Sequence, residues 1–412
     1  MSLDYEIFTP TFMKENGVFS QRKTDLEFSK LGFSYWQENG ETCWDCHNIY
    51  TVPLSFYHKM NSAVKALNDV VLKTVDHICK NPDLMTKMEI PPSIIPDIID
   101  SWNNEQELRL LGRFDLAIQT DGSIKALEFN GDTPTTLIES ALIQPAVIRN
   151  YIKAHGTDKR FCRDTINGDR IRPLMVASLF QLRQKLRSET LHLAACTESK
   201  EDLSHISLYR IFAELAGFST SSLDMSDIGL DDGDEKIFYD KAMRQIKCLY
   251  TLYPWEFIFE DEFGSALLQS WRDKKIQCIE PLWKHLASNK GLFAVAYKLF
   301  PGHPNLLPTF FSDDPDAKSL RSQKFVSKPM VGREGQNIKI VESDGSMVSS
   351  DGTYFGKNIL QKYATLPVLN NKHTVIGGWI INDCPAGFLV RSDRNSIIQN
   401  SSMSAALAII ND

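Results

Sequence analysis

The chain has 412 residues, with 45 Lys and Arg against 52 Asp and Glu, and its net charge of −7 argues against a protein that binds nucleic-acid phosphates. A hydrophobic fraction of 42% and a charged fraction of 24% are ordinary for a globular protein, and the length suits one large composite unit. No signal-peptide pattern opens the chain, and no apolar run approaches the roughly 18 residues of a membrane helix. We therefore expect a cytoplasmic protein without membrane insertion.

The first 50 residues look irregular and contain the segment CWDCH at 43–47. This is literally the C-x-x-C-H pattern of haem attachment or half of a zinc site, but no second pair of ligands follows at metal-site spacing. Ordinary packing is the favoured interpretation, with a bound metal or thiol redox chemistry as the alternatives. The eight cysteines of the chain are expected to be free thiols, because they are scattered and no secretory context is indicated.

Residues 56–80 predict an amphipathic helix, since Met60, Val64, Leu67 and Val71 recur at spacings of three and four. Several prolines in the segment 81–96 then end the helical pattern. We expect residues 1–110 to form a mostly helical N-terminal part of a single 412-residue unit.

The segment GRFDLAIQTDGSIKALEFNGDTP at 112–134 predicts a β-hairpin, with Asp121-Gly122 as a two-residue loop. In that register Asp115 lies opposite Glu128 and Arg113 lies opposite Asn130, with all four side chains on one face. The other face is expected to be apolar: Phe114, Leu116, Ile118, Leu127 and Phe129. The segment DTPTTLIESALIQ that follows is typical of an entry into another helix.

Two directly opposed carboxylates would lie roughly 5 Å apart and repel each other, so something must compensate. Asp115, Glu128 and Asn130 could hold Mg²⁺, which prefers oxygen ligands. Alternatively, the face is solvated and Arg113 neutralises the acids, and the hairpin alone leaves both possibilities open. Removing one acid should then relieve repulsion and leave the fold intact.

Residues 111–300 are expected to combine the hairpin with an α/β region. Strands at 191–196 and 246–254 alternate with a helix at 201–216, closed by Gly217, and a long helix at 281–300, which favours a βαβ-type layered unit. From residue 324 onward, short strands between Gly, Asn and Asp turns predict an antiparallel sheet within a third part, 301–412.

The segment KFVSKPMVGREGQNIKIVES at 324–343 could bind phosphate. One strand ends at Lys328-Pro329, a loop holds Gly332, Arg333 and Gly335, and a second strand begins at Asn337. Glycines allow close backbone approach and Lys328 supplies a charge, although such loops are also ordinary turns. With few buried contacts, the loop is expected to be mobile without nucleotide.

The common nucleotide and hydrolase signatures are missing. G-x-G-x-x-G, G-x-S-x-G and H-E-x-x-H are absent, and GTYFGKN at 352–358 is one residue short of a P-loop and lacks its Ser or Thr. A serine hydrolase or a zinc protease is therefore disfavoured.

The hairpin and the glycine-rich loop, together with LYPWEF, PLWKHLASNKGLFAVAYKLFPGHPNLLP and VRSDRNSII, resemble the synthetase domain of glutathionylspermidine synthases. They are especially similar to stand-alone members that lack the amidase domain. The resemblance runs from about residue 30 to about residue 400. It implies a mixed α/β, ATP-grasp architecture with a preceding βαβ-type substrate domain. It also implies a ligase in which ATP phosphorylates a carboxylate and an amine attacks the acyl phosphate.

The resemblance also assigns roles by position. Asp115, Glu128 and Asn130 would hold two Mg²⁺ ions, while Arg113 and Arg391 would act on the transferring phosphoryl and the acyl phosphate. The ATP-binding residues would be Lys290, Lys328, Gly332, Arg333, Glu334, Gly335, Gln361, Lys362, Tyr363, Ala364, Ile397 and Ile398.

The substrate positions depart from the family. Its glutathione-contacting serine is Thr133 here, and the acidic pair Glu201-Asp202, which matches the polyamine-contacting position, is followed by Leu-Ser rather than a polar residue and Tyr. The expected partners are a small-molecule carboxylate and a cationic amine. A non-catalytic module binding nucleotide or polyamine, or a phosphotransferase, are the alternative functions.

Overall fold

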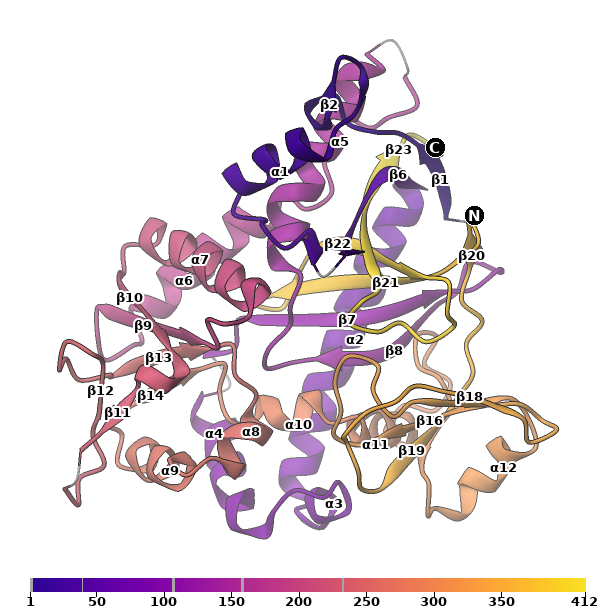
Figure 1. Ribbon diagram of the computed structural model, residues 1–412. Coiled ribbons are helices and arrows are strands. Elements are labelled where there is room, and N and C mark those ends of the chain that lie inside the picture. Colours follow the sequence, from indigo (N-terminus) through magenta and orange to yellow (C-terminus); the bar gives the residue numbers. More distant parts are fainter. Residues whose placement is uncertain (1–2, 39, 106–107, 157–158, 232) are drawn as a thin grey trace.

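A computed structural model describes residues 3–38, 40–105, 108–156, 159–231 and 233–412 of the chain. The largest sheet has eight strands and draws on the beginning, middle and end of the sequence (Figure 1). Their order is β1 (Asp4–Ile7), β6 (Trp44–Pro53), β23 (Met403–Ile410), β22 (Cys384–Asp393), β21 (Lys372–Ile381), β7 (Leu111–Ile118) and β8 (Ile124–Asn130), with β20 (Val368–Leu369) paired to β21.

The helix expected over 56–80 is α2 (Leu54–Lys80), which packs against β6, β21, β22 and β23 of this sheet (Figure 1). Its stripe of Met60, Val64, Leu67 and Val71 is buried, which confirms the periodicity argument. The N-terminal segment also contains α1 (Gln21–Lys30), and α2 is followed by α3 (Asp83–Lys87) and α4 (Ile95–Glu105). Two short hairpins pair β2 (Lys14–Glu15) with β3 (Val18–Phe19) and β4 (Gln37–Glu38) with β5 (Glu41–Thr42).

The prediction that residues 1–50 are irregular missed β6, an inner strand that contains Cys46 and His47. Cys46 is buried, and Nδ1 of His47 lies 2.9 Å from Oγ1 of Thr9. None of the eight cysteines forms a disulfide. Among the described residues no group of three or more His, Cys, Asp and Glu side chains is arranged to hold a metal. The burial of Cys46 is what the packing interpretation of this segment expects.

The second sheet confirms the βαβ expectation, because its four strands are all parallel: β10 (Ser219–Asp224), β9 (Thr190–Ala195), β13 (Cys248–Thr251) and β14 (Gln277–Ile279). The helices of this region are α6 (Ile171–Arg183), α7 (Lys200–Leu215), α8 (Trp255–Glu260) and α9 (Gly264–Arg272), and β11 (Gly229–Leu230) pairs with β12 (Phe238–Tyr239). Gly217 follows α7 with φ of +90°, as expected for a residue that ends a helix.

The third sheet is antiparallel, as expected for the region after 324: β15 (Thr309–Phe311), β19 (Asn358–Lys362), β16 (Phe325–Pro329), β17 (Lys339–Val341) and β18 (Met347–Ser349). The short helix α12 (Lys318–Arg321) packs beside it (Figure 1). The strand after the glycine-rich loop, β17, begins at Lys339 rather than at Asn337, where it was expected. Asn337 has φ of +53° and so belongs to the loop.

The prediction of one long helix over 281–300 is wrong, because this segment forms two helices, α10 (Lys284–Ser288) and α11 (Gly291–Leu299). The backbone N–H of Lys290 donates to the carbonyl of Met330 at 2.8 Å instead of continuing a helix. The side chain of Asn289 accepts from the N–H of Gly291 and donates to the carbonyl of Met88. These tertiary contacts place Lys290 beside the glycine-rich loop.

The hairpin of β7 and β8 has the expected register at its polar residues, with Asp115 opposite Glu128 and Arg113 opposite Asn130. The prediction of a two-residue loop is wrong. The N–H of Gln119 donates to the carbonyl of Ser123 at 2.8 Å, so the loop has three residues and ends at Gly122 with φ of +74°.

The three-residue loop shifts the register of the two strands by one residue. A β-bulge between Asp115 and Leu116 shifts it back, because Leu127 has no cross-strand partner there. The side chain of Leu127 consequently packs with Ala117, Ala364 and Val375 on the polar face, not on the apolar face as expected. The bulge thus adds an apolar group beside the charged residues.

The segment after the hairpin enters a π-helical turn, Glu139–Ile143, and continues as α5 (Gln144–Ala154). No helix in the described part of the chain combines the length and apolar character that crossing a membrane requires.

Candidate active site

Of the four polar hairpin residues, Arg113 and Asp115 are buried, and Glu128 and Asn130 are half-buried. Arg113 and Asp115 are 5% and 7% exposed, and their Nε and Oδ1 atoms are 3.1 Å apart. Nζ of Lys290 lies 3.3 Å from Oε2 of Glu128. Each opposed carboxylate therefore has its own cationic neighbour, which offsets the repulsion expected from the sequence.

Positive charge dominates the electrostatics of this cluster. Burial would raise the pKa of Glu128, but Lys290, Lys328 and Arg113 outweigh it and hold that pKa at about 2. Burial lowers the pKa of Lys328 to about 8 even though Glu128 opposes the shift. Burial and the neighbouring Arg113 also lower the pKa of Arg391. Excess positive charge of this kind suits an anionic ligand.

The donor set of Asp115, Glu128 and Asn130 fits a hard divalent cation. Two carboxylates face each other across the strands, and the buried Nδ2 of Asn130 has no hydrogen-bond partner among the described residues. Turning that amide over would present its oxygen in the same place. Oxygen donors of this type are the ligands that Mg²⁺ prefers.

Two cavities meet at this carboxylate pair. The larger cavity has a volume of about 900 Å³, and its lining includes Arg113, Asn130, Thr133, Glu201, Asp202, Arg333, Glu334 and Arg391. The smaller pocket, of about 90 Å³, is lined by residues that include Lys328, Gln361, Lys362, Tyr363, Ala364, Ile397 and Ile398. Asp115, Glu128 and Gly335 line both. The structure thus brings the sequence-predicted residues together, although they come from distant segments.

Gly335 of the glycine-rich loop lines the smaller pocket. A Cβ atom on Gly335 would lie 2.3 Å from the carbonyl oxygen of Ile398, so only glycine fits there. Nζ of Lys328 donates to the carbonyl of Leu127 and to Oε1 of Gln361, both at 2.9 Å. Lys290 lines neither cavity, and its Nζ donates to the carbonyl of Gly332 at 2.5 Å.

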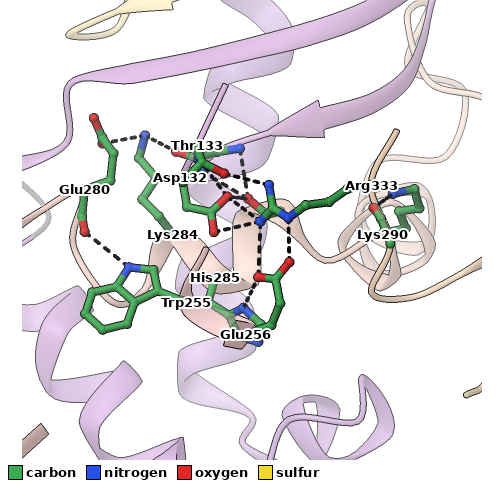
Figure 2. A network of polar contacts seen from close by, with 12 residues as sticks. Asp132, Thr133, Trp255, Glu256, Glu280, Lys284, His285, Lys290 and Arg333 are labelled. Carbon is green, nitrogen blue, oxygen red and sulfur yellow. Dashed lines mark hydrogen bonds and ion pairs between the residues drawn. The ribbon is translucent and has the colours of Figure 1, made fainter. Parts of the chain in front are cut away.

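The side chain of Arg333 is directed into a buried ion-pair network (Figure 2). Its Nε donates to Glu256 at 2.6 Å, its Nη1 to Oγ1 of Thr133 at 2.7 Å, and its Nη2 to both oxygens of Asp132 at 3.0 Å. Burial alone would lower the pKa of Arg333, but the two acids raise it above its ordinary value. The expectation that this loop has few buried contacts is therefore wrong.

Sequence reasoning assigned no role to Asp132 or Glu256. Oγ of Ser288 donates to Oδ1 of Asp132 at 2.7 Å and accepts from the N–H groups of Gly131 and Asp132. Both acids lie in segments that carried the family resemblance, FNGDTP and LYPWEF, and this was the available signal. Their function as partners of Arg333 depends on a fold contact between segments far apart in the sequence.

A third cavity, of about 710 Å³, lies on the Arg391 side and is called here the acidic chamber. Its lining includes five carboxylates, from Glu41, Glu139, Glu198, Glu201 and Glu334, against Lys200 and Arg391. Burial raises the pKa of Glu139 to about 8 and that of Asp202, at the edge of the larger cavity, to about 6. Glu201, Glu334 and Arg391 line both cavities, so the two are neighbours.

The strand β22 presents Arg391 to both cavities. Its Nη2 donates to the carbonyl of Gln399 at 2.6 Å, while its buried Nε has no partner among the described residues. On the other side, Nη1 of Arg113 donates to the carbonyl of Thr135 at 2.8 Å. The two guanidinium groups therefore border the same space as the carboxylate pair.

Comparisons with known proteins find similarity over most of the chain. A family model described as "Glutathionylspermidine synthase preATP-grasp" matches residues 16–409. A Haemophilus influenzae protein named "Putative acid--amine ligase" is 28% identical over 386 residues, covering 90% of this chain and 93% of that protein. Trypanothione synthetase from Crithidia fasciculata is 23% identical over 390 residues, which are 88% of this chain and 56% of that protein, so the chain spans about half of this relative.

Among solved structures, a glutathione synthetase-like effector from Globodera pallida has a TM-score of 0.56 at 10% identity, and the match covers 97% of this chain and 99% of that chain. This likeness concerns the fold alone. Together with the family match it confirms the mixed α/β, ATP-grasp architecture expected from the sequence. The chain belongs to the glutathionylspermidine synthase family.

Proposed function

We propose that the protein is an ATP- and Mg²⁺-dependent ligase that joins a carboxylate to an amine through an acyl phosphate. The observation that carries this proposal is the position of Asp115 and Glu128, which line both the small pocket and the large cavity. A phosphoryl group that leaves a nucleotide in one space and reaches a carboxylate in the other would pass beside these two residues.

The nucleotide would lie between the antiparallel sheet and the hairpin. Apolar walls formed by Leu127, Ala364 and Ile397 suit a flat base, and the buried charge of Lys328 suits its phosphates. The pocket of about 90 Å³ is smaller than the few hundred Å³ of a typical ligand site. ATP binding would therefore involve movement of the loop 332–335 and extension of the phosphates toward the larger cavity.

The donor carboxylate would bind in the larger cavity beside Arg113 and Arg391. One of its oxygens attacks the γ-phosphorus, the bond to the β-phosphate oxygen breaks, and ADP leaves. The nitrogen of the amine then attacks the acyl carbon, inorganic phosphate leaves, and the amine gives up a proton. In both steps the guanidinium groups would stabilise charge on oxygen while the buried site excludes water.

Asp115, Glu128 and Asn130 would hold Mg²⁺, two ions by resemblance to the family. Bound Mg²⁺ would neutralise charge on the phosphates. Around it, the side chains of Lys290, Lys328, Arg113 and Arg391 would complete a positively charged surface for a polyanion.

The amine acceptor would approach from the acidic chamber. Glu139, with a pKa of about 8, is mostly neutral at pH 7, but the other four acidic residues of this chamber still outnumber its two cationic residues, so it attracts a positively charged group. Glu201 lines the wall shared with the larger cavity, and Asp202 borders that cavity beside it. This supports a cationic amine as the acceptor. By resemblance to the family, the donor would be a peptide-like carboxylate near Thr133, which lines the larger cavity.

The decisive experiment is a screen of carboxylate and amine pairs with the purified full chain, ATP and Mg²⁺, in which ADP release and amide mass are both recorded. The ligase proposal requires ADP and an amide in equal amounts. A stable phosphorylated product without amide would indicate a phosphotransferase instead. Nucleotide binding with no ADP release from any pair would indicate a non-catalytic module.

A further inference from the structure

The larger cavity has an aromatic side that the reaction described above does not use. Tyr253, Phe257, Tyr354 and Phe355, called here the aromatic rim, all line this cavity. Phe355 is 85% exposed and Phe257 is 37% exposed. The rings of Tyr253 and Phe257 meet edge to face, with centroids 5.6 Å apart.

The rim joins two regions that are distant in sequence. Tyr253 lies in the connection between β13 and α8 and Phe257 lies on α8, whereas Tyr354 and Phe355 belong to the segment between β18 and β19. The latter segment is GTYFGKN, which resembles a P-loop only incompletely. In the fold its residues Thr353, Tyr354 and Phe355 line the larger cavity.

The segment that carries Phe355 is fastened at both ends. The N–H of Lys357 donates to Oε2 of Glu89 at 2.8 Å, and the N–H of Thr353 donates to Oε1 of Gln336 at 3.2 Å. Gly356 has φ of +127°, and a Cβ atom there would lie 2.6 Å from Oε2 of Glu89. Phe355 is thus held in its exposed position by contacts of the neighbouring backbone.

The rim belongs to the donor side of the site. In the described part of the chain, neither the acidic chamber nor the small nucleotide pocket has any of the four aromatic residues in its lining. Arg113 and Arg391, which would bind the donor carboxylate, line the same cavity as the rim. A donor held by its carboxylate therefore shares this cavity with the aromatic rim.

Large exposed apolar side chains that face a ligand cavity are typical of a surface completed by the ligand, because covering them removes apolar area from water. We propose that the aromatic rim binds an apolar side chain of the acyl donor, so that the preferred donor is a peptide-like carboxylate with a hydrophobic residue. This inference rests on the proposed ligase function and adds the donor's chemical class to it.

The dipeptides Phe-Gly and Ser-Gly test the proposal directly, since they share one terminal carboxylate and one charge state and differ in a single side chain. Their affinities for the full chain are measured by calorimetry in the presence of Mg²⁺ and a non-hydrolysable ATP analogue. We expect Phe-Gly to bind about tenfold more tightly or better, and Phe355→Ser or Phe257→Ser to bring the ratio close to one.

Phe180→Ser is the matched control, because Phe180 is a 53%-exposed phenylalanine on α6 that lines none of the cavities described above. It should leave the affinity ratio unchanged. Equal affinity of the two dipeptides, including failure of both to bind, would overturn the proposal. So would an affinity ratio that survives in both rim variants.

Turnover separates this inference from two other outcomes. If Phe355→Ser keeps the affinity ratio but releases more ADP per amide formed, the ring serves to exclude water and the donor-binding proposal is wrong. If the ratio behaves as expected but no carboxylate and amine pair yields ADP, the ligase proposal fails while the rim remains a binding site for an apolar carboxylate.

Discussion

Glu128→Gln isolates the charge of one opposed carboxylate while keeping the size of the side chain. In the folded protein the pKa of Glu128 is about 2, against an ordinary value of 4.5, because Lys290, Lys328 and Arg113 outweigh the effect of burial. The difference corresponds to about 3 kcal/mol of stability at neutral pH. Since the pKa is depressed in the fold, this stability is fully present above about pH 4.5 and is lost as the pH falls toward 2.

The expected effect on melting follows from the size of the chain. At roughly 2.1 cal/mol/K of unfolding entropy per residue, 412 residues give about 0.9 kcal/mol/K, so the melting temperature should fall by about 3–4 °C. Repulsion between the two acids, considered from sequence alone, would instead predict a higher melting temperature for the variant. The structure reverses it because the substitution leaves Nζ of Lys290 without its carboxylate at 3.3 Å.

The assay is a thermal melt at pH 7 without nucleotide, together with ATP turnover. Glu189→Gln is the matched control, because Oε1 of Glu189 is 2.9 Å from Nη2 of Arg183 but its side chain is 85% exposed, and a surface pair of this kind contributes about 0–1 kcal/mol. A Glu128→Gln protein that melts at or above the wild-type temperature would refute the electrostatic reasoning. Normal ATP turnover in this variant or in Asp115→Asn would refute the metal assignment.

Three further predictions concern the loop, the nucleotide and the substrates. Nucleotide affinity should fall as the pH rises through about 8, because Lys328 then loses its proton. Lys328→Met should bind nucleotide weakly, with an affinity that does not depend on pH in this range. A fluorescent-nucleotide titration in which the wild-type affinity is equally independent of pH would contradict this. Arg333→Gln should remove the guanidinium partner of Asp132 and Glu256, destabilise the protein by about 3–5 kcal/mol and speed amide exchange at 330–337. Unchanged exchange would show that the network does not hold the loop. Glutathione and spermidine should give little or no ADP release, since the residues after Glu201-Asp202 are Leu-Ser, and efficient formation of glutathionylspermidine would disprove that expectation without affecting the ligase assignment.

The sequence by itself determined the local elements whose signals are local. The periodicity of α2, the parallel α/β alternation and the antiparallel character of the region after 324 all follow from side-chain patterns within short windows. The pairing of Asp115 with Glu128 was predicted for a partly wrong reason. A three-residue loop and a bulge shift the strands in opposite senses, and neither departure is visible in the alternation of polar and apolar residues.

Tertiary structure decided the features that join distant segments. The division of the 281–300 helix depends on the carbonyl of Met330, and the fastening of Arg333 depends on Asp132 and Glu256, which lie about 200 and 77 residues away in sequence. The sign of the charge balance around Glu128 was equally hidden, because Lys290 and Lys328 reach it from other elements. A buried charge is stabilised or destabilised by every charged neighbour within a few ångströms, and only the folded chain specifies which neighbours those are.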